Sequence, residues 1–143
     1  YKKLMVKVRV KVPLFPTESE EKVRQAVKNI LDVEITGKDK CDDYWVLVGK
    51  GEGERTLLKL HFLIRRDRIA DAVRSKLLKC VIGNSIVFHA NKQAAYAGHF
   101  SFSEPGESPL GTIEIKITCD DPQKLIDWLA PPSERSEVKS QGG

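Results

Sequence analysis

The chain has 143 residues, of which 41% are apolar and 31% are charged, and its formal net charge is +4. This apolar content excludes a disordered chain, and the apolar runs are far shorter than the ~20 residues of a membrane-spanning helix. The length favours one domain, which we expect over residues 1–132, with a polar, disordered tail over residues 133–143.

The distribution of charge predicts how the surface is divided, and the cysteine usage predicts the cellular compartment. Residues 50–80 hold nine basic and four acidic groups, whereas residues 85–130 hold three basic and six acidic groups, so we expect a basic side and an acidic side. The three cysteines are widely spaced and form no Cys-x-x-Cys pair. This usage argues against a secreted disulfide framework and predicts a cytoplasmic protein.

The first third of the chain predicts a strand and a helix. Apolar and basic residues alternate over residues 3–12, which is typical of a half-buried strand, and Pro13 is expected to stop it. Thr17 and Glu20 have the spacing of a capping box, which predicts a helix from Thr17 to about Leu31.

The remaining elements follow from periodicity and from turn residues. We expect a short strand near residues 33–35, a turn over 37–40, a central strand over 44–48 and a mobile loop over 49–53. Helical stretches over 54–64 and 67–79 follow, and the pattern leaves open whether they form one bent helix. Strands are expected over 85–89, 96–102 and 112–118, and Asp121 and Pro122 open a last helix.

This order of elements predicts an α+β domain. We expect a mixed or antiparallel sheet of about six strands, with the helices packed on one face.

The motifs of common enzymes are missing from the sequence. The glycines at 49, 51 and 53 lack the Gly-Lys-Ser/Thr ending of a phosphate-binding loop, and no serine stands in a nucleophile elbow. The three histidines have no second ligand at metal spacing. We therefore expect no catalytic residues, no metal and no cofactor.

The middle helical region carries the strongest functional pattern. On one continuous helix, four basic residues would share an arc of about 80° around the small residue Ala72. These residues are Arg65, Arg68, Lys76 and Lys79. Such a stripe can approach a phosphate backbone, although charged helix faces are more often simply solvated. If Asp67 starts a new helix, Arg65 leaves the arc.

A second candidate site is the segment Asn91, Lys92 and Gln93, with Tyr96 just after it. Amides can pair with base edges, lysine with phosphate, and tyrosine can stack on a base. The alternative is that these amides bond the local backbone. The basic face of the first strand, with Lys3, Lys7, Arg9 and Lys11, is interpreted as protection of an edge strand.

Several strings in the chain resemble an archaeal family of uncharacterised proteins. They include Asn91-Lys92-Gln93-Ala94-Ala95 and Asp127-Trp128-Leu129-Ala130-Pro131, and the resemblance spans about residues 3–131. Members are small cytosolic proteins described as RNA-binding domains, sometimes as predicted exosome subunits. Their fold is similar to that of the ribosomal protein that holds the five-S rRNA, so the resemblance implies a ribosomal-protein-like fold and RNA as a partner.

Two main functional hypotheses remain from the sequence. The first is a non-catalytic RNA-binding module, linked to RNA processing or to the ribosome, that uses the two candidate sites. The alternative is a structural or interaction protein that forms a homodimer through a sheet edge or an apolar surface near Phe100 and Phe102. The ending Gly142-Gly143 also resembles that of small protein modifiers.

Overall fold

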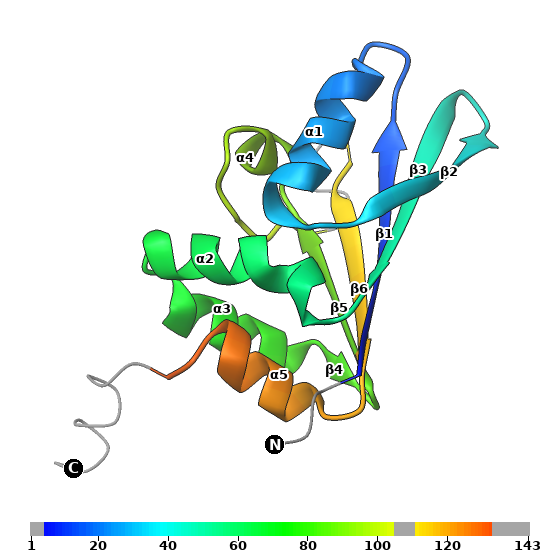
Figure 1. Ribbon diagram of the computed structural model, residues 1–143. Helices are drawn as coiled ribbons and strands as arrows, with labels where there is room; N and C mark the ends of the chain where they lie inside the picture. Colours follow the sequence, from blue (N-terminus) through cyan, green and yellow to red (C-terminus); the bar gives the residue numbers. More distant parts are fainter. Residues whose placement is uncertain (1–4, 105–110, 133–143) are drawn as a thin grey trace, which may run out of the picture.

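A computed structural model of the chain describes residues 5–104 and 111–132 (Figure 1). The expected strand start at residue 3, most of the expected loop after residue 104 and the expected tail over residues 133–143 lie outside these ranges. Within them, no helix is both long and apolar enough to cross a bilayer.

The described residues form one antiparallel sheet of six strands in the order β2-β3-β1-β6-β5-β4. The strands are β1 (Val6–Leu14), β2 (Glu34–Cys41), β3 (Tyr44–Glu52), β4 (Val81–Ile82), β5 (Ser85–Ala90) and β6 (Ile113–Cys119). The helices are α1 (Glu20–Ile30), α2 (Leu58–Arg66), α3 (Ala70–Lys79), α4 (Lys92–Tyr96) and α5 (Pro122–Leu129), with a 3-10 turn over Glu54–Leu57. Figure 1 shows all the labelled helices on the same side of the sheet. The predicted α+β class and the one-sided helix layer are confirmed.

β1 confirms the predicted alternation but not its interpretation. Val6, Val8, Val10 and Val12 are buried under the helices, and the residues between them are exposed or half-buried. β1 lies between β3 and β6, so the edge-strand explanation for its lysines is wrong. The strand also continues through Pro13 to Leu14. Its pairing with β6 ends at Lys11, so β1 has one neighbour there and tolerates the missing N–H.

The hairpin of β2 and β3 corrects two predictions. The turn expected over residues 37–40 lies instead at Asp42 and Asp43, and Gly37 lies at a register shift inside β2. Of the three glycines expected in a mobile loop, Gly49 and Gly51 are part of β3, which ends at Glu52. A Cβ at Gly49 would lie 3.1 Å from Ile35 Cδ1, and one at Gly51 would lie 2.9 Å from Thr56 Cγ2. These glycines therefore allow close packing rather than hinge motion.

The ends of two helices differ from the expected ones. Ser19, rather than Thr17, caps α1, because its Oγ accepts a hydrogen bond from the Lys22 N–H at 3.4 Å. The middle region forms two helices. They are separated at Arg68, whose φ of +55° lies in the left-handed region and interrupts the helical path.

The strand expected over residues 96–102 is not formed. Asn91 caps the short helix α4 instead, and the following segment makes only an isolated bridge between Ala90 and Phe102. Phe100 is buried and stacks edge-on against Phe88, with centroids 6.0 Å apart. The apolar surface proposed there for a homodimer is therefore largely inside the core.

Candidate nucleic-acid interface

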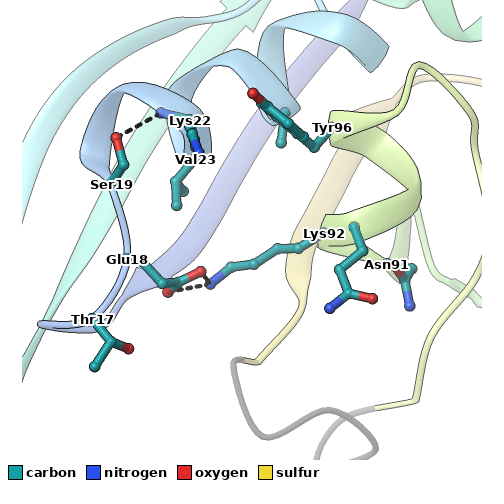
Figure 2. Close-up of a pocket in the computed structure, with 10 residues that line it drawn as sticks. Thr17, Glu18, Ser19, Lys22, Val23, Asn91, Lys92 and Tyr96 are labelled. Carbon is teal, nitrogen blue, oxygen red and sulfur yellow. Dashed lines mark hydrogen bonds and ion pairs between the residues drawn. The ribbon is translucent and has the colours of Figure 1, made fainter.

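A pocket of about 380 Å³ lies between the start of α1 and helix α4 (Figure 2). It gathers the whole second candidate site, since Asn91, Lys92, Gln93 and Tyr96 all line it. The opposite wall consists of Thr17, Glu18, Ser19, Lys22, Val23 and Ala26. The volume lies at the lower end of the range for small-ligand sites.

Helix α4 is fixed in place by two asparagines. The Oδ1 of Asn91 accepts a hydrogen bond from the Ala94 N–H at 2.9 Å, which satisfies one free donor at the helix start. From α1, the Nδ2 of Asn29 donates to the carbonyl oxygens of Ala95 at 3.0 Å and Tyr96 at 3.2 Å. These bonds hold both walls of the pocket at a set distance, so the pocket is built into the fold.

Lys92 has a structural partner, Glu18, on the opposite wall of the pocket. Its Nζ lies 2.9 Å and 3.1 Å from the two carboxylate oxygens of Glu18 and donates to the Pro13 carbonyl oxygen at 2.6 Å. The side chains of Lys92 and Glu18 are only 8% and 12% exposed, and burial lowers the pKa of Lys92. Figure 2 shows the Lys92 side chain reaching from α4 to Glu18. The ammonium group is thus engaged inside the protein and holds α4 to the end of β1.

The remaining groups of the pocket suit a flat, partly polar ligand. Val23 and Ala26 are buried and form an apolar floor, whereas Tyr96 is 49% exposed beside it. Gln93 is exposed, and the Nδ2 of Asn91 makes no hydrogen bond to a described residue because the cap uses only Oδ1, so this amide can donate to a ligand. Lys22 is exposed on the rim, with no ion pair to any described residue. An aromatic ring, amides and a cation are therefore available around one apolar floor.

The four basic residues of the first candidate site do not share one helix face. Arg65 lies on α2, Arg68 in the connection, and Lys76 and Lys79 on α3. Lys76 forms an ion pair with Glu104 at 2.8 Å, which raises the pKa of the lysine. Arg65, Arg68 and Lys79 are exposed, and none of them pairs with a carboxylate among the described residues. The break at Arg68 separates Arg65 from the arc that a continuous helix would form.

The α1 side of the pocket was not predicted as part of a site. The sequence pattern identifies Thr17 only as the cap of a helix, and Ser19 and Lys22 lie within the range expected for that helix. The sequence pattern did not show that α1 and α4 lie side by side, because the hydrogen bond that joins them, from Asn29 to Ala95, links residues 66 positions apart. A capping signal in front of α1 and another at Asn91 are the local patterns that mark the two walls.

Comparisons with known proteins agree with the resemblance noted from the sequence. A family model described as RNA binding matches residues 7–119. UPF0201 proteins from Sulfurisphaera tokodaii and Thermococcus onnurineus are each 44% identical, over 89% and 87% of this chain and 88% and 90% of their own lengths. The 2.2 Å crystal structure of a UPF0201 protein from Methanococcus jannaschii is 32% identical, with a TM-score of 0.79 over 90% of this chain and 95% of that one. The chain therefore belongs to this archaeal family, which carries the name UPF0201 and the description RNA binding.

Proposed function

We propose that this protein is a non-catalytic RNA-binding module that holds an unpaired nucleobase in the pocket between α1 and α4. The observation that carries the proposal is the position of Tyr96, a half-exposed aromatic ring beside the apolar floor of Val23 and Ala26. Bases stack on such rings, and sequence-specific proteins read unpaired bases in this way. The family description supports RNA as the ligand class.

Each wall of the pocket has a distinct role in this proposal. Tyr96 stacks on the base, Gln93 and the free Nδ2 of Asn91 contact its polar edge, and Lys22 contacts the adjoining phosphate. Lys92 acts through position, because its bonds to Glu18 and Pro13 fix α4. Arg65, Arg68 and Lys79 offer further exposed cations for the backbone, and Lys76 joins them when its bond to Glu104 opens.

We propose the cytoplasm as the compartment in which the protein acts. Cys41, Cys80 and Cys119 are all free thiols, which is the usual state of cysteines in a reducing compartment.

The test measures binding of a fluorescently labelled single-stranded RNA by anisotropy, with the full chain. Replacing the stacking ring by Tyr96→Ala should weaken binding by about 5- to 150-fold, since base–aromatic stacking contributes ~1–3 kcal/mol. Tyr96→Phe keeps the ring and should bind nearly as tightly as wild type. Phe62→Ala is the matched control, because Phe62 is an aromatic side chain that is 63% exposed on α2, away from the pocket residues.

Two results would contradict the proposal. Wild-type protein that binds no single-stranded RNA at low salt would exclude the function. Equal losses for Tyr96→Ala and Phe62→Ala would exclude the pocket as the base site.

A further inference from the structure

The face of the sheet opposite the helices carries exposed cations on three adjacent strands. Every second residue of β1 is exposed on this face, and its direct partners on β3 and β6 share the same face. The labelled helices lie on the other side of the sheet (Figure 1). The exposed cations on this face are Lys7, Arg9 and Lys11 of β1, Lys50 of β3 and Lys116 of β6.

The strand register places three of these cations in one row. Arg9 is the direct partner of Lys50 on one side and of Lys116 on the other. Side chains of directly opposite residues lie about 4.5–5.5 Å apart at Cβ, and like charges in such pairs destabilise a sheet. The central strand thus repeats an unfavourable pairing on both of its sides.

The charges of this row are incompletely balanced within the described part of the protein. No ion pair to a described residue involves Arg9, Lys50 or Lys116. Glu34 is the partner of Lys50 on the outer side, so Lys50 has one carboxylate opposite it. By contrast, the direct partners of Arg9 are both cations, and those of Lys116 are Arg9 and Val87.

The rows on either side are closer to neutral. Lys7 faces Glu52 and Lys11 faces Glu114 across the strands. Glu114 itself lies 3.6 Å from His89, and the carboxylates therefore border the cationic row without entering its centre.

Protection of a sheet edge does not account for this pattern. β1 is an inner strand, and the edge strand β2 has its own charged residues, Lys38, Asp39 and Lys40, together with a register shift. The repulsion between Arg9 and its two cationic partners is not offset by an ion pair to a described residue. This unbalanced positive charge points to a negatively charged ligand.

We infer that the open sheet face binds the phosphate backbone of single-stranded RNA through Arg9 and Lys116, with Lys50 beside them. Neighbouring strands lie about 4.8 Å apart, so the row spans roughly 10 Å across β3, β1 and β6. Adjacent phosphates of a strand laid across the sheet meet a cation at each step, which releases counterions. This inference rests on the proposed RNA function and adds a backbone site separate from the base pocket.

The experiment measures anisotropy of a labelled 12-nucleotide single-stranded RNA and of an abasic oligonucleotide of the same length, between 50 and 300 mM KCl. The variant Arg9→Gln/Lys116→Gln removes two charges and creates no new repulsion. The slope of log affinity against log salt should become shallower by about 1.4, since each phosphate contact on a single strand contributes about 0.7. The loss should be equal for both oligonucleotides. Lys124→Gln on α5 is the matched control and should leave the slope unchanged, because Lys124 is exposed on the helix side.

The outcomes separate this inference from the proposed function. If the double variant keeps the wild-type slope while Tyr96→Ala weakens binding of the base-bearing RNA, the backbone site is wrong and the base pocket stands. If the double variant has a shallower slope of log affinity against log salt, but Tyr96→Ala leaves the RNA affinity unchanged, the sheet site is supported and the base pocket is excluded. If Lys124→Gln, which removes one charge, makes the salt slope shallower by half as much as the double variant does, the effect follows net charge and the sheet site is excluded. Absence of any RNA binding by wild type excludes both.

Discussion

The buried ion pair between Glu18 and Lys92 gives a sharp test of how the pocket is held. In Glu18→Gln, the shape of the side chain is kept, and the Lys92 ammonium loses the Glu18 carboxylate while it keeps the Pro13 carbonyl as an acceptor. Removing one charge of a fully buried pair costs about 3–5 kcal/mol. Both side chains keep some exposure, 8% and 12%, and glutamine still offers an acceptor oxygen. We therefore expect a loss of about 2 kcal/mol in the free energy of unfolding.

The measurement is urea unfolding of four proteins in a double-mutant cycle. Lys92→Met keeps an apolar chain above the Phe15 ring, which the Lys92 Nζ now approaches to 5.5 Å from the centroid. Because Glu18→Gln/Lys92→Met removes both charges of the pair, it should be more stable than Glu18→Gln alone. Strictly additive losses, or a loss below about 0.5 kcal/mol for Glu18→Gln, would show that water screens the pair and would refute the reasoning.

Two further predictions concern single side chains. Asn91→Ala removes the cap of α4 and should cost about 1 kcal/mol in urea unfolding, whereas Asn91→Ser keeps an acceptor and should cost little; equal losses would contradict the capping role. His61 has a buried Nδ1 without a partner among the described residues, and burial lowers its pKa from 6.5. The unfolded chain then binds more protons as the pH falls below 6.5, so wild type should lose stability there. His61→Phe, which keeps the ring stacked on Trp128, should lose less over the same pH range, and a parallel loss in both proteins would oppose the assignment.

Local patterns predicted the elements whose neighbours impose no special demand. The alternation of β1 and the Asp121 cap of α5 depend only on residues that are close together in the sequence, and both are present in the structure. Gly49 and Gly51 were misinterpreted because their role depends on space taken by Ile35 and Thr56 in other segments. A short run of glycines is typical of a loop until those neighbours are known.

The candidate site was partly predictable for the same reason. Gln93 and Tyr96 lie within one turn of α4, so their grouping follows from the sequence, although the segment was expected to lead into a strand. The role of β1 required the strand order, since its partner β6 begins about 100 residues later along the chain. A lysine pattern that suits an edge strand needs another explanation on an inner strand whose Arg9 is the direct partner of Lys50 and of Lys116.

The cationic row makes stability and binding respond in opposite directions to one substitution. In Lys116→Glu, the repulsion from Arg9 becomes an attraction across the β1–β6 pair. A cross-strand charge pair contributes roughly 0.2–1 kcal/mol, so the free energy of unfolding should rise by about 1 kcal/mol at low salt, while RNA affinity falls. Lys116→Gln removes the repulsion only, and it should gain about half as much stability. Both gains should shrink in high salt, because exposed charges are screened.

A residue retained for packing would show the reverse, with lower stability in both variants. Such a result would mean that the Lys116 side chain stabilises the sheet, and the case for a ligand on the open face would lose its energetic basis.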